Sequence, residues 1–127
     1  MKLIVAGSRT IWDKKAVEYC LDQVEAEILV TEIVTGGALG IDSVADKVAK
    51  DRQICRTIMF ANWDKFDNSA GPKRNIRMAN YGDALLAIWD GHSEGTRDMI
   101  VKAEKRRIPA YVFMYDLVTK QVTRESA

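Results

Sequence analysis

Short, mostly apolar runs alternate along the chain with longer segments that carry a single apolar stripe. A run that is apolar without strict alternation is typical of a strand that is buried on both faces of a sheet. We therefore expect five strands, over residues 3–7, 33–35, 54–60, 84–89 and 110–115. The striped segments between them predict four helices, over residues 13–27, 41–52, 72–81 and 96–107.

The regular alternation of strands and helices predicts right-handed βαβ units, and hence a mainly parallel sheet. We expect a single domain over residues 1–127, built as a Rossmann-like three-layer α/β/α sandwich around a five-stranded sheet. Residues 61–71 are polar and lack periodicity, so they are expected to form a loop. The tail, residues 117–127, either adds a short edge strand through 118–122 or is frayed.

The composition is that of an ordinary folded domain and narrows the choice of partners. The 127 residues carry a formal net charge of +1, which gives no overall electrostatic reason to bind DNA or RNA. The end of the last predicted helix carries a basic cluster, which comprises Lys102, Lys105, Arg106 and Arg107. Cations there complement the helix dipole, so a solvated helix end is favoured over a nucleic-acid patch.

The N-terminal segment and the small number of cysteines indicate where the protein is located. Only four apolar residues separate Lys2 from Gly7, which is far short of a signal peptide, and no apolar run approaches a membrane span. Cys20 and Cys55 are too few for a disulfide framework, and no cluster of residues has metal-ligand spacing. We therefore expect a reduced cytoplasmic protein with no metal, no cofactor and no membrane partner.

Three glycine-bearing loops follow the first, second and fourth predicted strands, at residues 7–9, 36–42 and 91–96. Ligands of open α/β sheets bind beyond the carboxyl ends of the strands. Glycine there lets backbone N–H groups approach an anion closely, and the dipole of the following helix favours negative charge. The 36–42 loop lacks both the GxGxxG fingerprint and a P-loop lysine. The three loops together still predict a phosphate-bearing small molecule.

Charged side chains near these loops have either a ligand role or a structural one. Arg9 can fork onto a phosphate or pair with Asp13, and the first role is slightly favoured. Asp42 lies in the first turn of a predicted helix, where it acts as a cap or as the partner of a ribose hydroxyl. Lys73 and Arg74 occupy a helix start, an unfavourable place for cations unless an anion is near. That mismatch favours a ligand role for Arg74.

Hydroxyl and aromatic side chains leave similar alternatives open. Ser93 and Thr96 lie in the third loop, where they help to form an anion nest or simply cap the following helix. Near the strand ends lie three tryptophans, Trp12, Trp63 and Trp89. Either one of them stacks on a base, or each of them packs in the core or at its rim.

Four segments, in order along the chain, resemble the motifs of one superfamily. They are a Gly-Ser-Arg start at 7–9, a Val-Thr-Gly-Gly-x-x-Gly-x-Asp-x-x-Ala stretch at 34–45, a Gly-Pro-x-Arg-Asn-x-x-Met helix at 71–78 and a Gly-x-Ser-x-Gly-Thr loop at 91–96. The chain resembles the SLOG superfamily, which includes Smf/DprA and the Lonely Guy phosphoribohydrolases, and within it the YspA/YpsA-like family of bacteria and phages. This resemblance implies a Rossmann-like sheet, a nucleotide-derived ligand at the strand ends and a homo-oligomer.

The resemblance to the Lonely Guy enzymes also implies a catalytic alternative, hydrolysis of the N-glycosidic bond of a nucleoside monophosphate. Arg74 then falls on their catalytic arginine and Asp98 on their catalytic glutamate. In such a site the carboxylate stabilises an oxocarbenium-like centre while the arginine holds the leaving base or the phosphate. Asp98 is one methylene shorter than glutamate, Met99 stands in place of a second acid, and Asp90 replaces a proline. Arg97, beside Asp98, is a candidate to pair with it.

We therefore expect a module that binds a nucleotide or nucleotide-derived small molecule, as a sensor or as a sequestering protein. The first alternative is a phosphoribohydrolase with Arg74 and Asp98 as catalytic residues, and the second is DprA-like nucleic-acid binding, which the net charge disfavours. The expected determinants of base specificity follow the third strand and are Asn62, Trp63, Asp64 and Lys65. The predicted ligand-binding residues are Gly7, Ser8, Arg9, Thr35, Gly36, Gly37, Gly40, Asp42, Trp63, Asp64, Arg74, Asn75, Asp90, Gly91, Ser93, Gly95 and Thr96.

Overall fold

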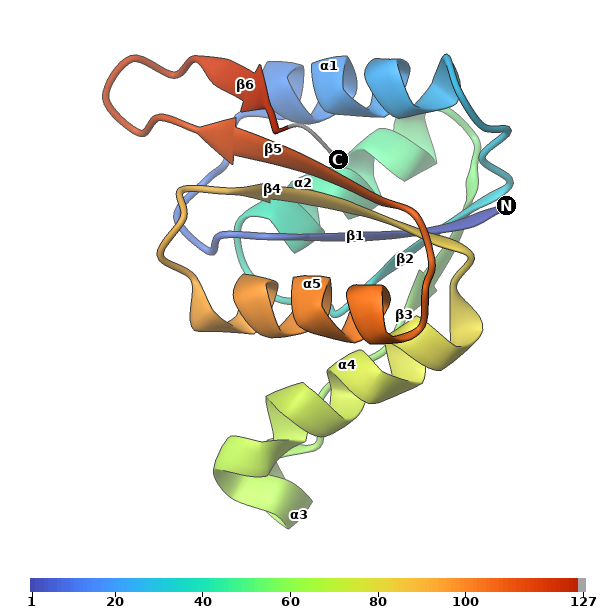
Figure 1. The fold of residues 1–127 in the computed structure, drawn as a ribbon, viewed down its shortest axis with the longest axis vertical. Helices are drawn as coiled ribbons and strands as arrows, with labels where there is room; N and C mark the ends of the chain where they lie inside the picture. Colours follow the sequence, from blue (N-terminus) through green and yellow to red (C-terminus); the bar gives the residue numbers. More distant parts are fainter. Residues whose placement is uncertain (126–127) are drawn as a thin grey trace.

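A computed structural model describes residues 1–125, in which one sheet lies between two layers of helices (Figure 1). The strands are β1 (Lys2–Gly7), β2 (Glu32–Thr35), β3 (Cys55–Ile58), β4 (Ala84–Trp89), β5 (Ala110–Tyr115) and β6 (Val122–Arg124). The helices are α1 (Lys14–Glu25), α2 (Ile41–Asp51), α3 (Trp63–Phe66), the 3-10 turn η1 (Asp67–Ser69), α4 (Ala70–Tyr81) and α5 (Glu94–Lys105). This arrangement confirms the predicted three-layer α/β/α sandwich.

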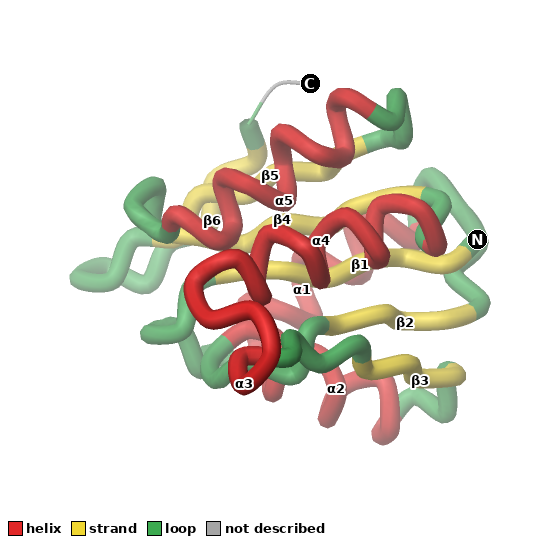
Figure 2. The backbone as a smooth tube through the Cα atoms, turned by 90° about the horizontal axis from the view of Figure 1, so that it is seen from below, coloured by secondary structure: helices red, strands yellow, loops and turns green. Residues whose placement is uncertain are grey.

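The strands lie in the order β3-β2-β1-β4-β5-β6, and Figure 2 shows them side by side with α4 and α5 in front. The first five strands are parallel, whereas β6 pairs antiparallel with β5. The chain runs outward from β1 to β3 and then returns to place β4 on the other side of β1. The carboxyl ends of β1 and β4 therefore form a topological switch point, where open α/β sheets leave a crevice for ligands.

The two faces of the sheet are packed by different helices because alternate residues of each strand point to opposite sides. In β1, Leu3 and Val5 belong to the core cluster beneath α1 and α2, whereas Ile4 and Ala6 belong to the cluster beneath α4 and α5. Leu3 and Ile4 are fully buried. Burial on both faces is the reason that the inner strands show continuous apolar runs rather than alternation.

The sheet has six strands, one more than the five that the sequence predicted. The sixth lies in the tail, but it begins at Val122 and not at residue 118. One carboxylate oxygen of Asp116 accepts hydrogen bonds from the N–H groups of Val118 (2.8 Å) and Thr119 (3.0 Å). An aspartate-initiated turn thus uses the N–H groups that a strand would need for pairing, so the strand starts after the turn.

Two further predictions about local structure were wrong. Residues 61–71 do not form an irregular loop, since they contain α3, η1 and the start of α4 at Ala70. The side chain of Asn62 caps α3 by accepting a hydrogen bond from the N–H of Lys65 (3.2 Å). In addition, β3 is an edge strand whose residues are mostly exposed, so it is not buried on both faces.

Two kinds of feature are absent from residues 1–125. No helix there is long and apolar enough to cross a bilayer. No group of three histidine, cysteine, aspartate or glutamate side chains in this part of the chain is arranged to hold a metal ion.

Candidate functional site

The three glycine-bearing loops lie together at the carboxyl ends of β1, β2 and β4. The carbonyl of Ser8 accepts a hydrogen bond from the N–H of Ile41 (3.2 Å), which joins the first loop to the start of α2. The hydroxyl of Ser8 donates to Asp90 Oδ1 (3.2 Å) and accepts from the Asp90 N–H (3.1 Å). Ser8 is 2% exposed, so this pair holds the first and third loops together instead of facing solvent.

Two glycines of the second loop are required by close contacts. Gly40 has a φ of +76°, and a Cβ there would lie 2.5 Å from the carbonyl oxygen of Arg9. Gly36 lies directly against the guanidinium group of Arg74, which would occupy the place of a Cβ. These glycines let the second loop pack against the first loop on one side and against Arg74 on the other.

The carboxylate of Asp42 binds the backbone of the second loop. It is 6% exposed, and its Oδ2 accepts hydrogen bonds from the N–H groups of Gly36 (3.1 Å) and Ala38 (3.2 Å). Burial raises the pKa of Asp42 to about 6, while the two N–H groups and the charges of Arg74 and Arg9 act in the opposite direction. Asp42 therefore occupies two backbone N–H groups of the second loop, a loop that the sequence predicted to bind an anion.

Arg74 is a half-buried cation that is held in place by neutral acceptors. Its Nη1 donates to the carbonyl of Gly36 (2.7 Å), and its Nε donates to Asn75 Oδ1 (3.0 Å). Burial lowers the pKa of Arg74, and the nearby charge of Asp42 partly offsets this. Within residues 1–125, Arg74 forms no ion pair and its Nη2 makes no hydrogen bond.

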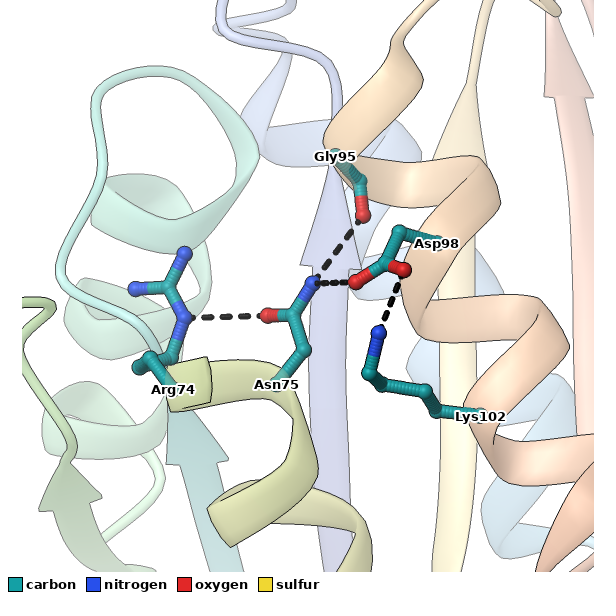
Figure 3. Close-up of polar contacts among 5 residues, drawn as sticks. All are labelled: Arg74, Asn75, Gly95, Asp98 and Lys102. Atoms are coloured by element: carbon teal, nitrogen blue, oxygen red, sulfur yellow. Dashed lines mark hydrogen bonds and ion pairs between the residues drawn. The ribbon is translucent and has the colours of Figure 1, made fainter. Parts of the chain in front are cut away.

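A chain of polar contacts runs from Arg74 to α5 (Figure 3). The side-chain amide of Asn75 is 4% exposed and donates to the Gly95 carbonyl (3.3 Å) and to Asp98 Oδ2 (2.9 Å). The other oxygen of Asp98 pairs with Lys102 (2.5 Å). Both oxygens of Asp98 thus have a donor.

The pairing of Asp98 differs from the one proposed on sequence grounds. Arg97 does not bind Asp98, because its guanidinium group lies over the ring of Trp89, 5.8 Å from the ring centroid. Residues 97 and 98 are adjacent on a helix and project in different directions, whereas Lys102 lies four residues on and shares the face of Asp98. The spacing of four residues between Asp98 and Lys102 was the sequence signal that could have identified this pair.

The third loop begins α5 with a capping arrangement. Ser93 Oγ accepts hydrogen bonds from the Thr96 N–H (3.3 Å) and from the Thr96 hydroxyl (3.0 Å). Gly95 lies between them, and a Cβ at this position would meet nothing within 4 Å. Because glycine weakens a helix relative to alanine by up to about 1 kcal/mol, the fold alone gives no reason for a glycine here.

Two cavities open at this end of the sheet. The strand-end cavity, of about 270 Å³, is bordered by Arg9, Asp42, Arg74, Asn75, Gly95 and Thr96. The Trp63 cavity, of about 610 Å³, is bordered by Arg9, Trp63, Arg74, Glu94, Gly95 and Asp98. Arg9, Arg74 and Gly95 border both, so the two cavities adjoin along these residues.

Arg9 borders both cavities and does not form the alternative pair with Asp13. One oxygen of Asp13 caps α1 by accepting from the Ala16 N–H (3.1 Å), and the other accepts from the Tyr115 hydroxyl (2.9 Å). Within the described residues, Arg9 has no ion-pair partner. Two arginines without a paired carboxylate therefore border the same pair of cavities.

Several predicted site residues lie away from these cavities. Asp90 borders a different depression, beside His92. The Thr35 hydroxyl is buried and has no hydrogen-bond partner within residues 1–125. Asp64 is exposed on α3, and Gly91 packs towards the Met114 side chain.

One of the three tryptophans borders these cavities, and the other two lie away from them. Trp63 borders its cavity and is 47% exposed. Trp12 borders a separate depression, and Trp89 is buried beside α5. Only Trp63, among the three, lies where it can contact a ligand of the two arginines.

Sequence reasoning missed two polar side chains that border these cavities. Glu94 lines both cavities, and Asn68 lines the Trp63 cavity. An acidic residue one position after a serine cap is common in helices, so Glu94 carried no distinctive signal. Asn68 lies in η1, which was taken for part of an irregular loop.

Comparisons with known proteins agree with the fold and the loops. The sequence profile of the YspA, cpYpsA-related SLOG family matches residues 1–66, which contain the first two glycine-bearing loops. The Gene 61 protein of Mycobacterium phage D29 is 32% identical over 124 residues, which cover 88% of this chain and 95% of the phage protein.

A solved structure gives the same architecture. DNA processing protein A (DprA) from Streptococcus pneumoniae superposes with a TM-score of 0.72 at 19% sequence identity, over 92% of this chain. The match covers 51% of the DprA chain, so the present chain spans about half of that protein. At this identity the likeness concerns the fold. The profile match over residues 1–66 shows that the chain belongs to the YspA, cpYpsA-related SLOG family.

Proposed function

We propose that the chain binds a nucleotide or nucleotide-derived small molecule at the switch point between β1 and β4, and acts as a sensor or a sequestering module. One observation carries this proposal. Arg9 and Arg74 border the same two cavities, and neither has an ion-pair partner within residues 1–125. Arg74 is partly buried and the charge of Asp42 offsets its burial only in part, so an anion bound between Arg74 and the exposed Arg9 would be stabilised.

The free edge of Arg74 supports a phosphate as the anion. Its Nη1 and Nε are fixed by Gly36 and Asn75, so the guanidinium plane is oriented before a ligand arrives. The remaining Nη2 can donate to a phosphate oxygen, and charge-assisted hydrogen bonds of this kind are about twice as strong as neutral ones. Orientation in advance lowers the entropic cost of binding.

The start of α5 supports the same ligand class. The N–H groups of the first helical turn carry a partial positive charge, and a Cβ at Gly95 in this turn would meet nothing within 4 Å, so the space beside it is open. Space that the fold does not fill, beside two arginines, suits the close approach of a phosphate group. The Asp42 carboxylate occupies the N–H groups of the second loop, so the third loop is the better anion site of the two.

The Trp63 cavity supports a base next to the phosphate. Its volume of about 610 Å³ is in the range of small-molecule sites, which is roughly 300–1,000 Å³. The indole ring of Trp63 is half exposed at its edge and offers a flat apolar surface for stacking. A nucleotide would thus place its phosphate near Arg9 and Arg74 and its base against Trp63.

A second candidate function is the hydrolysis of an N-glycosidic bond. The observation that favours it is that Asp98 and Arg74 border the same cavity, with Asn75 bound to both. A carboxylate and an arginine in one cavity can stabilise an oxocarbenium-like centre and a leaving group. The ion pair of Asp98 with Lys102 reduces the negative charge that such a centre requires, which favours binding over hydrolysis.

The test is a thermal-shift screen against nucleoside mono- and diphosphates, cyclic dinucleotides and ADP-ribose derivatives, with mass spectrometry of each ligand afterwards. A ligand that raises the melting temperature and returns intact supports the binding module, because selective binding to the folded state stabilises it. Released base that disappears in Asp98→Asn would favour the hydrolase. No shift with any compound would contradict the proposal.

A further inference from the structure

We infer that the carboxylate of Glu94 binds the ribose hydroxyls of the ligand and makes the site selective for ribonucleotides over 2′-deoxyribonucleotides. This inference rests on the proposed function, because it assigns one more residue to the same site. Glu94 is the first residue of α5, it is exposed, and it borders both the strand-end cavity and the Trp63 cavity. A residue that borders both cavities lies where the two parts of one ligand would join.

The other carboxylates around the two cavities are already bound. Asp42 Oδ2 accepts two backbone N–H groups of the second loop. The two oxygens of Asp98 bind Asn75 and Lys102. Within residues 1–125, the Glu94 carboxylate forms neither a hydrogen bond nor an ion pair, so both of its oxygens are free to accept from a ligand.

The phosphate of the ligand and the Glu94 carboxylate are both negative, so they are expected to lie apart. A phosphate is attracted by Arg9 and Arg74 and is repelled by a free carboxylate. The part of the ligand that meets Glu94 is therefore a hydrogen-bond donor and not an anion. The positive end of the α5 dipole favours a negative charge at this position, which suits Glu94 to accept such bonds.

Ribose supplies donors in the required place. Its neighbouring 2′- and 3′-hydroxyls can donate to the two oxygens of one carboxylate, and they lie across the sugar ring from the 5′-phosphate. An acidic side chain on ribose hydroxyls is also a solution that dinucleotide-binding sheets use at their switch points. In this geometry the sugar lies between the arginines and Trp63, with Glu94 beside it.

The test measures, by calorimetry on the full chain, the dissociation constants of the ribonucleoside 5′-monophosphates and their 2′-deoxy counterparts. We expect the wild type to bind the ribose form roughly tenfold more tightly, since a hydrogen bond to a charged acceptor typically contributes that factor. In Glu94→Ala, the preference for the ribose form is lost, because the ribose form loses the bonds of both hydroxyls whereas the deoxy form loses only that of its 3′-hydroxyl. Glu104→Ala, on the same helix but outside both cavities, keeps the preference.

The outcomes that overturn the inference differ from those that overturn the proposed function. If Arg74→Ala abolishes binding but the ribose preference persists in Glu94→Ala, the site stands and the role of Glu94 is refuted. Equal affinity of the wild type for both forms, or an equal loss for both in Glu94→Ala, refutes that role as well. If the wild type binds none of these monophosphates, the inference fails, whereas the proposed function fails only if no compound of the thermal-shift screen binds either. Glu94→Gln repeats the comparison should Glu94→Ala not fold.

Discussion

Replacing Gly95 with alanine is expected to stabilise the free protein and to weaken its binding of a nucleotide. Gly95 lies in the first turn of α5, its φ is not positive, and a Cβ there would meet nothing within 4 Å. Alanine for glycine at such a position raises the free energy of unfolding by about 0.4–1 kcal/mol, chiefly because the unfolded chain loses freedom. For a domain of this size, about 0.5 kcal/mol corresponds to a rise in melting temperature of roughly 2 °C.

The same methyl group is expected to reduce affinity. Gly95 borders both the strand-end cavity and the Trp63 cavity, so the added carbon lies in the space assigned to the ligand. Forcing one extra carbon into a close contact costs about 1–3 kcal/mol, which corresponds to a loss of affinity of roughly fivefold to a hundredfold. Stability and binding should therefore change in opposite directions.

Gly40→Ala provides the matched control for this substitution. Gly40 has a φ of +76°, and its Cβ would be pressed against the carbonyl groups of Ser8 and Arg9. This change is expected to lower the free energy of unfolding by at least about 1 kcal/mol. Urea denaturation measures the stabilities, and calorimetry with a nucleotide from the thermal-shift screen measures the affinity. Gly95→Ala that binds as tightly as the wild type would refute the reasoning, because its space would then not belong to the ligand.

Three other substitutions test the site's construction. Burial raises the pKa of Asp42 from its ordinary value of 3.8 to about 6. As the pH rises from about 4 to about 6, Asp42 ionises in the unfolded chain before it ionises in the folded protein. The free energy of unfolding of the wild type should therefore fall by up to about 3 kcal/mol relative to that of Asp42→Asn. Urea titrations across that range would contradict this if the difference between the two proteins stayed constant. Ser93→Ala removes the cap of α5 and should lower the free energy of unfolding by about 1 kcal/mol, whereas Ser43→Ala, an exposed serine on α2, should cost less. Ser8→Ala leaves Asp90 without its buried partner and should cost about 1–3 kcal/mol; unchanged stability would mean that this pair does not hold the two loops together.

The strands and helices that could be predicted from the sequence are those with a clear local pattern. Continuous apolar runs marked β1 and β4 because both faces of these strands are buried. The helix predicted from residue 13 begins there because the side chain of Asp13 caps α1. The weak elements were short or exposed. The four residues of α3 are too few to show a periodic stripe, and β6 was displaced by a turn that Asp116 initiates.

For the candidate site, the sequence indicated the loops but not the contacts between them. Glycine loops and strand ends indicated where it lies. Arg74 was singled out as a cation at a helix start, but α4 begins at Ala70, so Arg74 is its fifth residue and that premise was wrong. Contacts between distant segments could not be read from the chain, because only the fold brings them together. The Asn75–Asp98 bond joins residues that lie 23 positions apart, and the Ser8–Asp90 bond joins residues 82 apart.

The most direct test of the central claim is the calorimetric affinity of a nucleotide, chosen by thermal shift, for the wild type, Arg74→Ala and Arg77→Ala. Arg74 and Arg77 lie on the same helix and each donates to a backbone carbonyl, but only Arg74 borders the two cavities. We expect Arg74→Ala to lower the affinity by roughly tenfold to a hundredfold and Arg77→Ala to leave it nearly unchanged. Equal affinities in all three proteins would contradict a phosphate site at Arg74.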